Sequence, residues 1–221
     1  MCLKKKKKNI FKKIMTTELQ TLSLSNRLYT YADYLTWNFT ERLELIKGKI
    51  FKMSPAPNLE HQKVSFEIAR QIGNYLLGKS CRAFSAPFDV RLPQVKGKKQ
   101  AADKNVYTVV QPDICVVCDA SKLDHRGCLG APDLVIEILS RSTAAKDLTE
   151  KYEVYEQSGV REYWVVFPYE QIVQAYDLDE TSGRYRLRKS YNRNEVIPVG
   201  IFSGFGITLS DVFEEKEEEH F

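Results

Sequence analysis

The sequence predicts an α/β protein in which a mixed β-sheet is flanked by helices, with added β-hairpins. Residues 109–118 and 134–139 are almost continuous apolar runs, which is typical of strands covered on both faces. Residues 59–78 repeat apolar side chains every three or four positions, which is typical of an amphipathic helix. Some connections between strands are too short for crossovers and others are long enough, so the sheet is expected to be mixed.

Length and composition favour one globular domain. The 221 residues suffice for one sizeable core and are few for two. The formal net charge of +4 does not argue for nucleic-acid binding, because a basic run near the N-terminus is partly balanced by an acidic run at the C-terminus. We expect a flexible basic extension over residues 1–27, one domain over residues 28–213 and an acidic tail over residues 214–221.

No segment of the sequence is suited to a membrane. No apolar run reaches the ~18 residues that a spanning helix needs, and the N-terminal segment lacks the apolar stretch of a secretory signal. The sequence therefore predicts no membrane partner and a cytoplasmic location. Its five cysteines are expected to be reduced thiols of the core in that compartment.

The first elements follow from local signals. Thr30 can cap a short helix over residues 31–38. Residues 42–53 alternate around a turn at 47–48, which predicts a β-hairpin. Glu44 lies on the first strand of this hairpin, on the face opposite its leucines, where a glutamate usually faces solvent.

The middle of the chain continues with a helix and several strands. The helix over residues 59–78 carries His61 in its first turn. Residues 84–92 are predicted to form a strand, with the polar Asp89 inside it. The loop over residues 93–105 is rich in lysine, and its lysines are candidates for contacts with phosphate groups. The two apolar strands at 109–118 and 134–139 follow.

The C-terminal part alternates again between helix and strand. A helix is predicted over residues 143–158, a buried strand over 162–167 and an antiparallel hairpin over 172–191, before residues 196–209 close the domain. One face of the helix is expected to hold Leu148, Tyr152 and Tyr155.

Two carboxylates lie where a buried strand should not hold them. Asp113 follows a proline at the start of one apolar run, and Glu137 lies inside the other. Burial of an unpaired carboxylate costs several kcal/mol, so such groups are usually paired, hydrogen-bonded or metal-bound. Together with Lys151, Glu44 and His61 they could form a site for a divalent cation. Singly, each has a simpler explanation: Asp113 could cap a turn, Glu137 could form a buried ion pair, and the others could be surface residues.

An ordered series of motifs resembles a known family. In sequence order these are ELIKG at residues 44–48, MSPAP at 53–57 with the following His61, VQPDICVV at 110–117, DLVIEILSRST at 133–143, D-x3-K-x3-Y at 147–155, and GVREYWVV at 159–166. Across about residues 28 to 212 the chain resembles the Uma2 family (DUF820) of restriction endonucleases, within the PD-(D/E)XK nuclease superfamily.

The resemblance implies a restriction-endonuclease-like fold and a Mg²⁺-dependent (or Mn²⁺-dependent) DNA endonuclease that hydrolyses phosphodiester bonds. It implies that Asp113, Glu137, Glu44 and the backbone carbonyl of Ile138 ligate the metal, and that Lys151 and His61 belong to the catalytic site. DNA is the implied partner, and a homodimer is one way to cut both strands.

One position departs from the superfamily pattern. The lysine of (D/E)XK should lie two residues after Glu137, where this chain has Leu139. The resemblance implies that the lysine has moved to Lys151 on the next helix, and Lys146 is the rival candidate. The missing lysine also leaves open a different class of function, a catalytically inactive nuclease-fold module for nucleic-acid or protein interaction.

A zinc site is the other metal centre that the sequence suggests. Cys115, Cys118, His125 and Cys128 are all zinc-ligating types. However, Cys115 and Cys118 lie in one predicted strand, and an offset of three places them on opposite faces. We therefore expect that these two cysteines do not bind zinc together.

Overall fold

A central six-stranded mixed sheet, in the order β12-β11-β10-β9-β6-β3, organises the protein. In the computed structural model of the chain, the residues described are 26–39, 41–53, 58–93, 102–140 and 147–213. Strands β9 and β10 run parallel, and the other neighbouring pairs are antiparallel. The strands are β3 (Arg82–Ser85), β6 (Ile114–Val117), β9 (Leu134–Ile138), β10 (Glu162–Phe167), β11 (Ile172–Asp179) and β12 (Arg184–Asn192).

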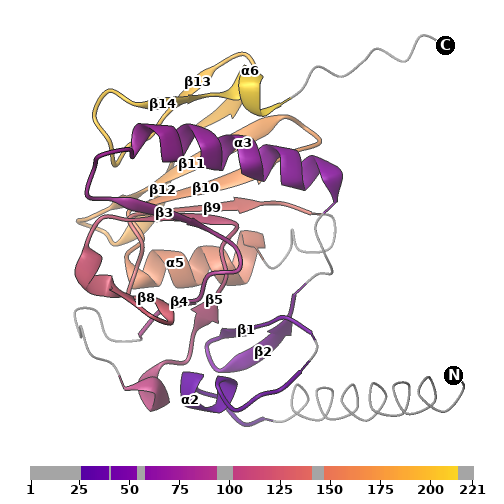
Figure 1. Cartoon of the computed structure of the whole chain (residues 1–221), viewed down its shortest axis with the longest axis vertical. Coiled ribbons are helices and arrows are strands. Elements are labelled where there is room, and N and C mark those ends of the chain that lie inside the picture. Colours follow the sequence, from indigo (N-terminus) through magenta and orange to yellow (C-terminus); the bar gives the residue numbers. More distant parts are fainter. Residues whose placement is uncertain (1–25, 40, 54–57, 94–101, 141–146, 214–221) are drawn as a thin grey trace, which may run out of the picture.

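Helices cover both faces of this sheet. Helix α3 (Leu59–Tyr75) lies on one face and α5 (Tyr152–Ser158) on the other (Figure 1). On the α3 side, Ile68 shares a core with Ile136 of β9, and on the α5 side Tyr155 shares a core with Val135. The short helix α6 (Leu209–Val212) and the two-stranded sheet of β13 (Val196–Pro198) and β14 (Gly206–Thr208) pack near α3.

A second six-stranded sheet lies on the α5 side (Figure 1), where the sequence predicted only one sheet. Its order is β2-β1-β5-β4-β8-β7, and it has parallel as well as antiparallel pairs. Its strands are β1 (Leu43–Ile46), β2 (Lys49–Lys52), β4 (Val90–Arg91), β5 (Val109–Val110), β7 (Leu123–Asp124) and β8 (Gly127–Leu129). Short helical turns accompany it: α2 (Tyr31–Tyr34), η1 (Asp103–Asn105) and η2 (Ala120–Lys122).

The prediction of two long strands was wrong, because the chain passes between the two sheets inside each of them. The strand predicted over residues 84–92 divides near Pro87 into β3 and β4, which belong to different sheets. The strand predicted over residues 109–118 divides near Pro112 into β5 and β6. Proline has no N–H to donate to a ladder, so both interruptions fall where pairing could not continue. Asp113 therefore lies directly before the first residue of β6.

Elements with strong local signals form as predicted. Thr30 and Asp33 make the reciprocal capping contacts of α2, and the Asn58 side chain caps α3. Hairpin β1–β2 turns at Lys47 and Gly48, whose φ values of 51° and 79° are left-handed and suit a tight two-residue turn. Strands β11 and β12 form the predicted C-terminal hairpin.

The helix predicted over residues 143–158 is described only from residue 147, and its first described turn is irregular. Asp147–Lys151 form a π-helical turn, and regular α-helix follows as α5. The apolar face was predicted wrongly, since Leu148 is 40% exposed whereas Lys151 is 3% exposed. The π turn changes the angular spacing of side chains between Leu148 and Lys151, so Leu148 does not share the inner face that holds Lys151 and Tyr155. The rival Lys146 lies outside the described residues.

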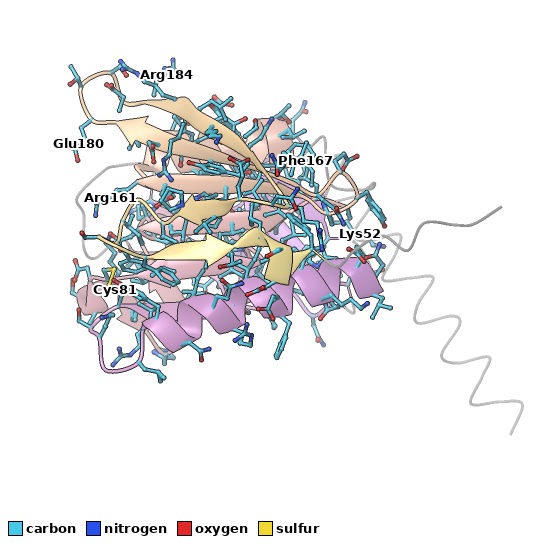
Figure 2. The ribbon with its side chains drawn as sticks, turned by 90° about the horizontal axis from the view of Figure 1, so that it is seen from above. Lys52, Cys81, Arg161, Phe167, Glu180 and Arg184 are labelled. Atoms are coloured by element: carbon cyan, nitrogen blue, oxygen red, sulfur yellow. A yellow bond between two sulfur atoms is a disulfide. The ribbon has the colours of Figure 1, made fainter. Side chains whose placement is uncertain are left out.

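Two of the cysteines are not reduced thiols. Cys81 and Cys118, 37 residues apart, form a disulfide. Continuing the β3–β6 register by one residue places them directly opposite each other on neighbouring antiparallel strands. Figure 2 shows Cys81 at one end of the sheet and Phe167, the last residue of β10, at the other. Cys115 and Cys128 keep free, buried thiols, and burial raises the pKa of Cys128 to about 12.

Several predicted features lie outside the described residues. These are most of the basic extension, the acidic tail and the lysines at positions 96, 98 and 99 of the loop over 93–105, whereas Lys104 lies on η1 and is exposed. Within the described part of the chain, no helix is long and apolar enough to span a membrane.

Candidate active site

Glu137 is a buried carboxylate in the middle of the fold. All five residues of β9 are buried, and Glu137 is 2% exposed. Side chains alternate across a strand. Ile136 and Ile138 pack in the core on the α3 side, so Glu137 faces α5. The glutamate inside an apolar strand was the sequence feature that first suggested a site. In the structure its side chain points to the helix.

Two side chains from that helix segment meet Glu137 at one oxygen. Lys151 Nζ lies 3.0 Å from Glu137 Oε1, and the hydroxyl of Tyr155 donates to the same oxygen at 2.6 Å. The two residues are four positions apart, so they lie on one side of the helix. The D-x3-K-x3-Y spacing places Lys151 and Tyr155 on one side of a helix and could have indicated this contact. We had predicted only that Tyr155 lies on the apolar face.

Glu44 reaches the same lysine from the other sheet. Its Oε1 lies 2.9 Å from Lys151 Nζ and accepts the backbone N–H of Gln111 at 3.0 Å. Glu44 is fully buried, so its expected exposure on the hairpin was wrong. Strand β1 packs between β2 and β5, and all four of its residues are buried. The expectation that Glu44 shares a sheet with Asp113 and Glu137 was also wrong, but the three elements converge on one site.

Asp113 lies beside Glu137 at the end of the neighbouring strand. Strand β6 pairs with β9 in a register that sets Ile114 opposite Ile136, and one further step sets Asp113 opposite Glu137. Directly opposed residues have Cβ atoms about 4.5–5.5 Å apart. Asp113 Oδ2 accepts the backbone N–H of Ile138 at 2.8 Å. The aspartate side chain is 21% exposed, which makes it the most accessible of the three carboxylates.

The backbone of Ile138 also faces this side. Within a strand, the N–H and C=O of one residue point to the same neighbour. The N–H of Ile138 points to Asp113, whereas the N–H of Leu139 donates to Val166 of β10 on the other side. The carbonyl of Ile138 is therefore directed to the side on which Asp113 lies.

His61 approaches Asp113 from α3. Its Nε2 lies 3.2 Å from Asp113 Oδ2, and the residue is 7% exposed. Asn58 accepts the backbone N–H of His61 at 2.9 Å, so the cap that starts the helix also fixes the position of the histidine. The structure thus places the five side chains in two sets of direct contacts: Lys151 bonds to Glu137 and Glu44, and His61 contacts Asp113, which lies beside Glu137 in the sheet.

A polar network borders the site next to Glu44. Gln111 donates from its side-chain nitrogen to Asp89 Oδ1 at 2.8 Å, and its side-chain oxygen accepts from Arg42. Burial, opposed by the Gln111 hydrogen bond and the charges of Arg91 and Arg42, raises the pKa of Asp89. The sequence analysis missed Gln111, which had no signal apart from its place before Pro112.

The donor atoms fit a hard divalent cation. If all are ionised, the three carboxylates exceed the single ammonium of Lys151 by two negative charges. Mg²⁺ takes oxygen ligands and commonly binds through one or two carboxylates while keeping several waters. In the described part of the chain, no three His, Cys, Asp or Glu side chains are grouped as ligands for one ion. Asp113, Glu137 and the carbonyl of Ile138 are the oxygen groups of the site that could hold such an ion.

The cysteines do not form the alternative metal site. Cys115 packs in the core on the α5 side, whereas Cys118 packs against the core on the α3 side. Their predicted placement on opposite faces of a strand is confirmed. Cys118 is bonded to Cys81 and has no thiolate to offer, and Cys128 donates to the carbonyl of Gly130.

Comparisons with known proteins agree on one family and one fold. The family model "Uma2: Putative restriction endonuclease" matches residues 31–210. The uncharacterized protein slr1290 of Synechocystis sp. is 26% identical over 125 residues, which are 56% of this chain and 60% of that protein. The chain thus matches less than two thirds of the length of that relative.

A solved structure shows the same fold. It is described as a putative nuclease belonging to DUF820 from Anabaena variabilis, and it matches with a TM-score of 0.65 at 23% sequence identity. The match covers 83% of this chain and 97% of that one. The likeness supports the restriction-endonuclease-like reading of the mixed sheet and its flanking helices.

Proposed function

Because the chain belongs to the Uma2 family of putative restriction endonucleases, we propose that it is a Mg²⁺-dependent endonuclease that hydrolyses phosphodiester bonds in DNA. Mn²⁺ is expected to replace Mg²⁺. The observation that carries the proposal is the convergence of Lys151 with Glu137 and Glu44 beside Asp113. These groups come from strand β1, the start of β6, strand β9 and the turn that precedes α5. Family membership supports a catalytic role for them.

Each residue has a distinct role in the proposed mechanism. Asp113, Glu137 and the carbonyl of Ile138 would hold the cation, and His61 holds Asp113 in place through the contact at Oδ2. A bound Mg²⁺ would activate water and stabilise the charge that develops on the phosphate. Lys151 places a second positive charge at the reacting phosphate or orients the attacking water. Glu44 keeps the ammonium of Lys151 within reach of Glu137 and could complete the metal site.

DNA is proposed as the partner on the basis of the family. The arginines of β12 are not a free basic surface, because Arg184, Arg186 and Arg188 each pair with a carboxylate. A homodimer would allow cleavage of both strands. A cytoplasmic location would suit a DNA substrate, although disulfides such as Cys81–Cys118 are uncommon there.

One observation favours the alternative of an inactive interaction module. Lys151 already bridges two buried glutamates, so this part of the site is charge-paired without a metal. A buried ion pair retained for structural reasons would look the same. Asp113, which is partly exposed and pairs with His61 rather than with Lys151, is a third carboxylate that a purely structural ion pair does not need.

Replacing Glu137 with glutamine should lower metal-dependent cleavage of DNA by at least about 100-fold, in the range for loss of one preorganised electrostatic group. Cleavage would be measured on varied plasmid and linear substrates with Mg²⁺ and with Mn²⁺. Glu156→Gln is the matched control, because Glu156 is equally buried but bonds to Arg184 and the backbone of Tyr185 away from the site.

An unchanged rate in Glu137→Gln would contradict the proposed role of this carboxylate. If the wild type cleaves none of these substrates with either metal, the endonuclease proposal fails and the interaction module is favoured.

A further inference from the structure

Tyr155 donates to a carboxylate that the proposed function uses as a metal ligand. The distance of 2.6 Å between its hydroxyl oxygen and Glu137 Oε1 lies in the range for a hydroxyl bonded to an ionised carboxylate. Neither residue is accessible, since Tyr155 has no exposed surface and Glu137 is 2% exposed. The bond is thus protected from competition with water.

Packing of the ring fixes where this hydroxyl lies. The ring of Tyr155 contacts that of Tyr163 on β10, with centroids 5.3 Å apart. The carbonyl of Tyr155 accepts the N–H groups of Gly159 and Val160 where α5 ends. Gly159 has a φ of 86°, which suits glycine at a helix end. Packing of the ring against Tyr163 and the contacts of the helix end thus hold the hydroxyl of Tyr155 at Glu137.

Tyr155 and Lys151 act differently on the charge of Glu137. In its contact with Glu137 Oε1 the Tyr155 hydroxyl is the donor, so it carries its proton and is neutral. A neutral donor orients a carboxylate without cancelling its charge. Lys151 also orients the carboxylate, but it contributes a positive charge that competes with a cation.

We propose that Tyr155 is a positioning residue that holds the Glu137 carboxylate in its metal-binding orientation. The inference rests on the proposed function and assigns a second role within the same site. Partners of a metal ligand that do not touch the metal typically change metal affinity or activity by about 10–100-fold when they are removed.

The test compares Tyr155→Phe with Tyr185→Phe. Each variant removes one buried hydroxyl from the same group of aromatic residues, because Tyr185 donates to the carbonyl of Val160 at 2.9 Å and makes no contact with the site carboxylates. Calorimetric titration with Mg²⁺ should show affinity weakened about 10–100-fold in Tyr155→Phe and unchanged in Tyr185→Phe. Melting temperatures of both variants separate this effect from a loss of stability.

A second measurement uses the unmodified protein and covers the case in which Tyr155→Phe does not fold. The hydroxyl proton of Tyr155 is protected from exchange with water by its buried bond to Glu137, so its NMR signal should be observable and should shift when Mg²⁺ is added. The signal of the Tyr185 hydroxyl should not shift. Equal Mg²⁺ affinity in the wild type and Tyr155→Phe, or an unmoved Tyr155 signal in a protein that binds Mg²⁺, would overturn the inference alone. A wild type that binds no Mg²⁺ would overturn the proposed function and this inference with it.

Discussion

Replacing Lys151 with alanine should lower metal-dependent cleavage by about two orders of magnitude or more, as expected for loss of a preorganised charge partner. The same change should lower the free energy of unfolding by about 3–5 kcal/mol, because it leaves buried carboxylates without their cation. The ammonium lies 2.9 Å from Glu44 and 3.0 Å from Glu137, and the lysine is 3% exposed. From the sequence alone, we expected that the replacement of Lys151 would leave the fold intact.

The direction in which Lys151→Ala changes Mg²⁺ affinity distinguishes a lysine at the metal site from a purely structural lysine. Removal of a positive charge beside Glu137 should strengthen Mg²⁺ binding even as cleavage falls, so added Mg²⁺ should raise the melting temperature of Lys151→Ala more than that of the wild type. Lys122→Ala is the control, since this half-buried lysine donates to the carbonyl of Ala131 and not to a carboxylate. If Lys151→Ala cleaves like the wild type and Lys146→Ala does not, the assignment of the lysine is wrong.

Replacing Glu162 with alanine should lower the free energy of unfolding by about 3–5 kcal/mol, the range for breaking a buried charge pair. Glu162 is 1% exposed and accepts from the indole of Trp164, from Arg188 and from the backbone N–H groups of Gly200 and Ile201. These donors tie β10 to the C-terminal hairpin and the chain that follows it. Chemical denaturation of the purified variant measures the loss.

Glu162 lies away from Glu137, because it pairs with Leu134, three positions earlier on β9, and its side chain shares the opposite sheet face with Trp164. Well below its melting temperature, Glu162→Ala should therefore keep its cleavage rate, in contrast to Lys151→Ala. Asp177→Ala is the matched control, because Asp177 pairs with the same Arg188 but its side chain is 45% exposed. This variant should lose less than about 1 kcal/mol of the free energy of unfolding. A comparable loss in both variants would show that burial of Glu162 does not matter.

Local patterns predicted the elements whose signals lie within a few residues. The hairpin of β1 and β2, helix α3 with His61 in its first turn, and hairpin β11–β12 follow from alternation, periodicity and capping. The division into two sheets could not be predicted in this way. It depends on which strands pair, and a proline inside an apolar run does not indicate that the chain changes sheets there.

The candidate site shows the same limit. The types and order of Glu44, Asp113, Glu137 and Lys151 were sufficient to group them. Their actual contacts depend on tertiary features: β1 is buried in the second sheet, and the helix face that holds Lys151 and Tyr155 packs on Glu137. The Cys81–Cys118 disulfide was missed for a related reason, because it follows from the register of β3 against β6.

The central claim is that Asp113 and its neighbours bind a divalent cation, and calorimetric titration of the wild type and Asp113→Ala with Mg²⁺ tests it most directly. Asp133→Ala is the control, since Asp133 is also a largely buried aspartate. It accepts the backbone N–H of Cys118, whose disulfide partner Cys81 lies at the end of the sheet opposite Phe167 (Figure 2). We expect the wild type and Asp133→Ala to bind Mg²⁺ and Asp113→Ala to bind it at least about 100-fold more weakly, the upper end of the effect of removing an indirect partner. Absence of binding by the wild type, or equal binding by Asp113→Ala, would contradict the account.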